Sequence, residues 1–166
     1  MVAELKSCAI MGVNGHIVTV ETDYFDSVPD FQIVGLGDTA VKESRERVKA
    51  ALKNSGINLP AKGFVANLAP ADMKKEGAFY DLPIAIGLAI SCKLLRNVNL
   101  DDCMFIGELS LTGEIRPVRG ILPSVIAAKE NNITKIFVPE MTKGITTFYS
   151  NSLSLYVTAL CRLGKI

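Results

Sequence analysis

The sequence predicts a mixed α/β (α+β) domain in which helices pack on a mixed sheet. Segments with strand character come first along the chain, and helices and strands then alternate, which is an order typical of this class. Hydrophobic residues make up 49% of the chain and charged residues 21%, so the sequence can build a sizeable core. Its 166 residues suit one domain. We expect the domain core in residues 1–140 and an extension of the same domain, with a strand and a short helix, in residues 141–166.

The first predicted element is a β-hairpin. Residues 9–13 and 16–20 have strand character and flank Asn14-Gly15. That dipeptide suits a type I′ turn because both residues tolerate positive φ. A third strand is predicted at residues 31–34.

The clearest helix is predicted from residue 39 to about residue 55. Asp38 or Thr39 can cap its N-terminus, and Gly56 can end it. Helical periodicity places a set of mostly apolar residues on one face, which we expect to pack on the sheet. This face consists of Val41, Ser44, Val48, Leu52 and Ser55.

After the first predicted helix, strands and helices alternate. Residues 64–68 predict a short buried strand, and a polar loop follows. Asp81 precedes Leu82-Pro83, so we expect Asp81 to be the N-cap of a helix that runs to about residue 95. This helix is apolar nearly all round and is therefore expected to be central. Beyond it we expect strands within 104–118 with a turn at Thr112-Gly113, a helix from about 123 to 131, strands at 136–138 and 153–157, and a short terminal helix.

Composition and short motifs exclude several classes of protein. No run of about 18 apolar residues is present, which argues against a membrane span, and the N-terminus lacks the features of a signal peptide. The cysteines show no C-x-x-C spacing, which favours reduced thiols in a cytoplasmic protein over a disulfide or zinc framework. His16 is the one histidine, so we expect no histidine-rich metal site. We also expect no cofactor site, because the sequence contains no G-x-x-x-x-G-K-[ST] motif.

A row of four cations is the first candidate binding site. Lys42, Arg45, Lys49 and Lys53 follow one line along the predicted helix at residues 39–55. Such a row can track a nucleic-acid backbone, because each neutralised phosphate releases counterions. The alternative is an ordinary solvated helix face, since Glu46 lies beside Lys42 and Lys49 and can pair with either. The formal net charge of +1 does not decide between the two.

Two further segments are weaker candidates. Lys74 and Lys75 follow the strand at residues 64–68 and could bind an anion, while Asp72 and Glu76 could hold a cation; alternatively, all four simply solvate a loop. The Gly35-Leu36-Gly37 segment opens a helix, as phosphate-binding loops do. However, the acidic residue that follows it favours a structural turn with an acidic N-cap.

Three long segments, in this order, resemble the N-terminal domain of the magnesium-chelatase-like proteins of the YifB/ComM type. They lie at residues 34–48 with 54–56, at 67–72, 75–77 and 81–85, and at 105–120. The resemblance implies the ribosomal S5 domain 2-like fold shared with Lon proteases. It also implies a cytoplasmic AAA+ ATPase, a homo-oligomer, whose ATP- and Mg-binding module follows this domain and is absent from this chain. Members of the family are linked to DNA handling, notably as hexameric helicases that drive branch migration during natural transformation.

The segment at 105–120 also resembles the Lon protease domain. Counting from it without gaps, the nucleophilic serine of Lon falls on Asp81 and its partner lysine on Ser124. We therefore expect no catalytic residues, and a non-catalytic accessory domain that aids DNA engagement or assembly. The alternatives are a Lon-type Ser/Lys peptidase with an altered site, and a fragment of a magnesium chelatase subunit.

Overall fold

The computed structural model describes residues 1–95, 99–139 and 154–158. Within these residues the chain forms three helices and nine strands. In chain order the elements are β1 (Ala3–Met11), β2 (Asn14–Phe25), β3 (Asp30–Val34), α1 (Thr39–Asn54), β4 (Gly63–Ala69), α2 (Asp81–Ser91), β5 (Cys103–Phe105), β6 (Glu108–Leu109), β7 (Ile115–Arg116), α3 (Ile121–Glu130), β8 (Lys135–Pro139) and β9 (Ser154–Thr158).

A seven-stranded sheet forms the centre of the fold, with strand order β3-β4-β2-β1-β5-β8-β9. The pairs β4–β2 and β2–β1 are antiparallel, whereas β3–β4, β1–β5, β5–β8 and β8–β9 are parallel. Strands β6 and β7 form a separate two-stranded hairpin. The predicted mixed sheet with packed helices is therefore confirmed, and β3 lies at one edge of the sheet.

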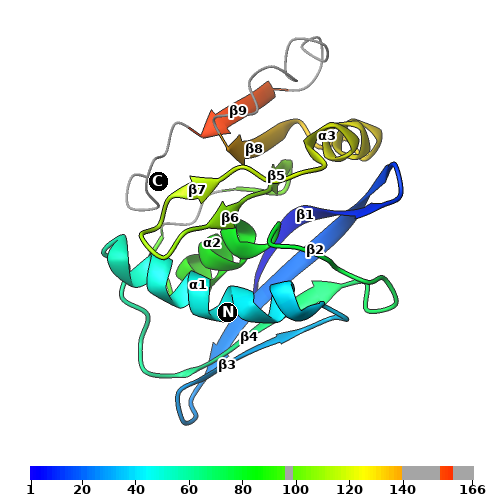
Figure 1. The fold of residues 1–166 in the computed structure, drawn as a ribbon. Coiled ribbons are helices and arrows are strands. Elements are labelled where there is room, and N and C mark those ends of the chain that lie inside the picture. Colours follow the sequence, from blue (N-terminus) through cyan, green and yellow to red (C-terminus); the bar gives the residue numbers. More distant parts are fainter. Residues whose placement is uncertain (96–98, 140–153, 159–166) are drawn as a thin grey trace.

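Helices cover both faces of the sheet. Successive side chains of a strand point to opposite faces, and neighbours such as Cys103 and Met104 accordingly belong to different apolar clusters. Helices α1 and α2 share the first cluster with Cys103, whereas α3 shares the second with Met104. Figure 1 shows α1 and α2 side by side across the sheet, and α3 apart from them beside the β1–β2 hairpin. In the described part of the chain, no helix is long and apolar enough to cross a membrane.

The predicted hairpin is confirmed, but its turn lies elsewhere. Met11 pairs with Asn14, so Gly12 and Val13 form the turn and Asn14-Gly15 belongs to β2. Gly12 adopts the positive φ of 63° that the turn requires. Gly15 meets a different constraint, because a Cβ there would lie 2.5 Å from the carbonyl oxygen of Pro123 at the start of α3. His16, which the turn prediction placed at the start of the second strand, is likewise inside β2.

The central helix α2 differs from its prediction at both ends. It is almost wholly buried, as expected, but it ends at Ser91 and not near residue 95. Asp81 is its first residue and not its N-cap; Tyr80 holds the cap position without a side-chain hydrogen bond. The last predicted strand is present as β9, while the predicted terminal helix lies outside the described residues.

Candidate nucleic-acid interface

Helix α1 has well-defined ends and a buried face that packs on the sheet. Asp38 is its N-cap, and the Oδ1 atom of Asp38 accepts a hydrogen bond from the Val41 N–H at 2.8 Å. Gly56 follows the helix with a φ of 83°. The buried face matches the prediction except at Ser55, which is half-buried while Ala51 is fully buried; it consists of Val41, Ser44, Val48, Ala51 and Leu52. The exposed surface of α1 is therefore fixed in place.

The four predicted cations, Lys42, Arg45, Lys49 and Lys53, are all exposed and lie along one flank of α1, about a quarter turn from the buried face; we call them the basic row. The ends of the basic row are eleven residues apart, which corresponds to about 16 Å along a helix axis. The sequence spacing predicted that Glu46 pairs with Lys42 or Lys49. Glu46 instead pairs with its neighbour Arg45, at 3.4 Å between Arg45 Nε and Glu46 Oε1. Both partners of this pair are more than half exposed, so the contact is weak.

A shallow groove lies beside the basic row, between α1 and the edge strand β3. Its volume is about 300 Å³, and its lining consists of Gln32, Ile33, Val34, Lys42 and Arg45. Two cations of the basic row thus border the edge of the sheet. Further along the row, Lys49 Nζ lies 5.8 Å from the ring centroid of Phe31, a distance that suits a cation–π contact.

One carboxylate borders the basic row at the start of β3. The side-chain amide of Gln32 and the backbone N–H of Phe31 donate hydrogen bonds to Asp30, and these contacts lower the pKa of its carboxyl group. Lys49 and Arg45 lower the same pKa to a smaller extent. Asp30 is therefore ionised near neutral pH and limits how far the positive potential of the row extends.

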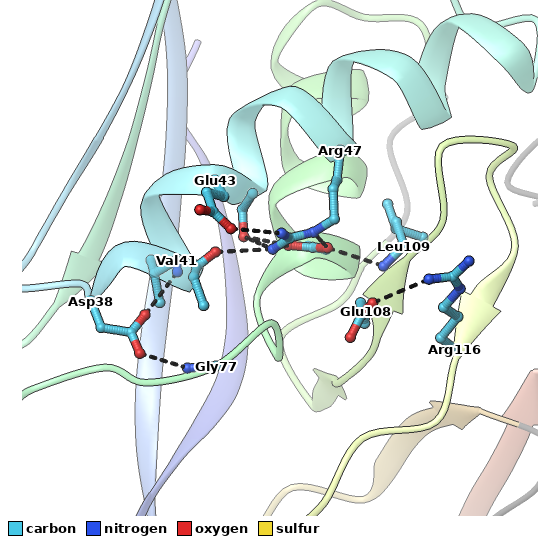
Figure 2. A network of polar contacts seen from close by, with 11 residues as sticks. Asp38, Val41, Glu43, Arg47, Gly77, Glu108, Leu109 and Arg116 are labelled. Carbon is cyan, nitrogen blue, oxygen red and sulfur yellow. Dashed lines mark hydrogen bonds and ion pairs between the residues drawn. The ribbon is translucent and has the colours of Figure 1, made fainter.

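Arg47, on the same helix, has a different role that the sequence analysis missed. Its guanidinium points inward, where Nε donates to Asp81 Oδ2 at 2.7 Å and Nη2 donates to the carbonyl oxygen of Ala40 at 3.0 Å. The Ser44 hydroxyl and the Leu109 N–H also donate to the Asp81 carboxylate. In Figure 2, dashed lines join Arg47 of α1 and the N–H of Leu109 to the carboxylate that lies between them. The network joins α1, the start of α2 and the β6–β7 hairpin.

The Asp81 carboxyl group is fully buried, and burial raises its pKa, while the hydrogen bonds from Arg47 and Ser44 oppose that shift. Contact with Asp81 in turn raises the pKa of Arg47, so the guanidinium stays charged. The sequence predicted Asp81 as an N-cap from its neighbours Leu82-Pro83. It could not reveal the network, because Ser44 and Arg47 lie more than thirty positions away in the chain.

The two positions that the sequence predicts to correspond to the Lon dyad lie on different faces of the sheet. Asp81 starts α2, in the layer of the first apolar cluster, and Ser124 belongs to α3 on the opposite face. Ser124 is fully buried, and its hydroxyl donates to the carbonyl oxygen of Gly120 at 2.8 Å. Both side chains are therefore occupied and closed to solvent.

The loop candidates Lys74 and Lys75 separate into two different environments. Lys74 is exposed, but its Nζ pairs with Glu76 Oε1 at 2.6 Å, which occupies the carboxylate that could have held a cation. Lys75 is buried, and its ammonium donates to the carbonyl oxygen of Pro70. Burial lowers the pKa of Lys75. Lys75 is therefore not at the surface, and neither an exposed anion site nor a solvated loop describes its environment.

The turn at Gly35-Leu36-Gly37 is structural, in agreement with the reading favoured from sequence. Asp38 caps α1 and also accepts a hydrogen bond from the Gly77 N–H at 3.2 Å (Figure 2). A carboxylate thus occupies the helix N-terminus where a phosphate would bind. Within the described residues, no group of three or more histidine, cysteine, aspartate or glutamate side chains could hold a metal ion.

Several known proteins are similar in sequence to this chain over most of its length. Competence protein ComM of Haemophilus influenzae is 43% identical over 129 residues, which cover 78% of this chain and 25% of that protein. The protein YifB of Escherichia coli is 44% identical over 133 residues, covering 74% of this chain and 26% of that protein. The Lon protease of Mycolicibacterium smegmatis is 26% identical over 139 residues, covering 80% of this chain and 18% of that protein.

The chain thus spans about a quarter of the length of ComM and YifB. The likeness to Lon over most of the chain agrees with the mixed sheet and its packed helices, as expected for a Lon-protease-like fold. The model of the protein family described as subunit ChlI of Mg-chelatase matches residues 20–142. The chain therefore belongs to the Mg-chelatase ChlI-subunit family, in company with ComM and YifB.

Proposed function

We propose that this chain is a non-catalytic accessory domain that binds the DNA backbone through the basic row. The observation that carries the proposal is the arrangement of the row: four exposed cations lie in one line on a helix that is anchored by its buried face. The name of the relative ComM, a competence protein, supports a role in DNA handling. We expect this domain to be part of a longer protein, called the parent protein below. In that protein it would help an ATP-dependent AAA+ DNA-processing enzyme bind its DNA substrate.

The geometry of the basic row favours phosphates over bases. A straight row of about 16 Å can lie along a backbone, where sequence-independent ion pairs release counterions. Of the four cations, Arg45 has a carboxylate partner, and that pair is exposed and easily exchanged for a phosphate. The groove beside β3 gives Lys42 and Arg45 a concave surface against which one phosphate can rest.

The burial of Asp81 and Ser124 supports the absence of peptidase chemistry. A serine nucleophile needs an accessible hydroxyl and a base within hydrogen-bond reach. Ser124 instead donates to Gly120, and Asp81 binds Arg47 on the other side of the sheet. The likeness to Lon is therefore expected to reflect shared fold and not shared reaction.

The remaining expectations concern the parent protein. Since ComM and YifB are about four times as long as their match with this chain, we propose that a separate module binds ATP and Mg²⁺ and assembles the homo-oligomer. This domain would then work beside that module in the cytoplasm. Its own contribution would be contact with DNA.

Fluorescence anisotropy of a labelled DNA duplex, measured against salt concentration, tests the proposal. We expect the slope of log K against log salt to be about −3.6 if all four cations contact phosphates. Lys42→Glu/Arg45→Glu should weaken binding at least about tenfold and reduce that slope by about 2.

The matched control is Arg119→Glu/Lys129→Glu, which makes the same change in net charge at two exposed cations at or near α3, away from the basic row. This control should bind within about twofold of the wild type, since long-range charge effects are screened at physiological salt. Equal losses in both double variants would show that net charge, and not the basic row, governs binding.

A further inference from the structure

Strand β3 forms an open edge of the central sheet. It pairs with β4 on one side, and in the described part of the chain no strand pairs with its other side. Such an edge presents backbone N–H and C=O groups with which another chain can pair. Native proteins often protect an edge strand with proline, lysine or a β-bulge. β3 has none of these, since it reads Asp-Phe-Gln-Ile-Val and its register with β4 is continuous.

The backbone of Ile33 faces this open edge. The N–H of Phe31 donates to Asp30 Oδ1 at 2.7 Å, which places it on the side of β3 away from β4. Alternate residues of a strand direct their backbone polar groups to the same side, so the N–H and C=O of Ile33 also point outward. The side chain of Asp30 thus covers the start of the edge and leaves it open at Ile33.

Cations lie along the same edge. Lys42 and Arg45 line the groove beside β3 together with Ile33 and Val34. Lys49 continues the line of cations toward the start of the strand. Val34 is 44% exposed and offers an apolar contact at the end of the strand. The groove therefore combines open backbone groups, a positive flank and a small apolar surface.

We propose that an extended acidic segment of a partner protein adds to β3 as a further strand of the sheet. In this mode of recognition backbone hydrogen bonds hold the segment, and its alternate side chains give specificity. Acidic side chains on the α1 side of the added strand would contact Lys42 and Arg45, in keeping with charge complementarity.

A second copy of this chain suits the edge less well. Pairing of two β3 strands edge to edge would place their two basic rows beside each other, and like charges repel. An acidic strand would occupy Lys42 and Arg45, so it and a DNA backbone would exclude each other. Binding of the strand itself does not depend on the proposed DNA binding.

Fluorescence anisotropy of a labelled octapeptide of alternating glutamate and valine, without DNA, tests the charge contacts. In a strand this alternation places every glutamate on one face. We expect saturable binding, and none by the same peptide with lysine in place of glutamate. Lys42→Glu/Arg45→Glu should weaken binding at least about tenfold. The matched control Arg119→Glu/Lys129→Glu should stay within about twofold of the wild type, because distant exposed charges are screened.

Two further peptides test the pairing with the backbone of β3. Both keep the same sequence; one carries N-methyl groups on two central glutamate amides, and the other on two central valine amides. An added strand directs only one of these sets toward β3, so methylation of that set should weaken binding at least about tenfold. Methylation of the other set should leave affinity within about threefold.

Three outcomes would overturn the added strand. Equal affinities of the two methylated peptides would show that the peptide does not pair with β3. Absence of binding by the unmethylated peptide would remove the site. Equal losses in the two double variants would show that net charge governs binding. Since duplex DNA is measured separately, each of these results leaves the proposed DNA binding to its own test.

Discussion

The Arg47 guanidinium on α1 and the Asp81 carboxylate at the start of α2 lie 2.7 Å apart, between Arg47 Nε and Asp81 Oδ2. Asp81 is fully buried, and the side chain of Arg47 is 20% exposed. The pair attaches the helix that carries the basic row to the centre of the domain. The orientation of the basic row therefore depends on a contact that lies beneath it.

Loss of this pair should destabilise the domain. Arg47→Met leaves the Asp81 carboxylate buried without its cation and should lower the free energy of unfolding by about 3 kcal/mol. A double-mutant cycle with Asp81→Asn, followed by urea denaturation, should return a coupling energy of about 2 kcal/mol. Arg45→Met, an exposed arginine on the same helix, should change stability by less than about 0.5 kcal/mol. Additive effects of Arg47→Met and Asp81→Asn would contradict a direct interaction.

The stability of the domain should fall in acid partly through Asp102. Hydrogen bonds from Thr134 and Lys135 lower the pKa of the Asp102 carboxyl group from 3.8 to about 2. A depressed carboxyl pKa stabilises the fold above the unfolded-state value, and this contribution is lost as pH falls from 3.8 toward 2. In urea midpoints measured across this range, Asp102→Asn should show a smaller decline than wild type. Asp101→Asn, its neighbour, is the matched control and should decline as wild type does.

Leu36→Gly should make the domain more stable. Glycine adopts the φ of 58° without the steric cost that leucine bears, and the replaced side chain is mostly exposed. We expect a gain of about 1 kcal/mol, or a rise in Tm of about 2–4 °C, in thermal denaturation followed by circular dichroism. A decrease in Tm would mean that the leucine side chain stabilises the fold despite its exposure.

The domain should not cleave peptide bonds. Incubated with fluorescently labelled casein, alone and with a separately added ATPase module, the wild type should release no more fluorescence than a buffer control. Ser124→Ala should give the same result, because its buried hydroxyl is bound to Gly120. Cleavage by the wild type that disappears in Ser124→Ala would contradict the non-catalytic reading.

The sequence by itself determined the features that depend on local spacing. The capped helix from Asp38 to Gly56, with an apolar stripe and, about a quarter turn away, the basic row, follows from helical periodicity and terminal residues. The hairpin of β1 and β2 and the strands β3, β4 and β8 follow from short apolar runs bounded by turn residues. These signals act over a few residues, so they can be recognised without knowing the fold.

Only the tertiary structure decided where residues far apart in the chain meet. Asp81 is predicted from its neighbours as a helix cap, yet Arg47 and Ser44 make it the centre of a buried network. Lys75 has the sequence context of a surface cation, yet the loop folds its ammonium against Pro70. The hairpin turn lies at Gly12-Val13 and not at the predicted Asn14-Gly15. The strand register and the close approach of α3 to Gly15 outweigh the turn preference of Asn14-Gly15. Burial and long-range hydrogen bonds set these outcomes, and neither leaves a periodic trace in the sequence.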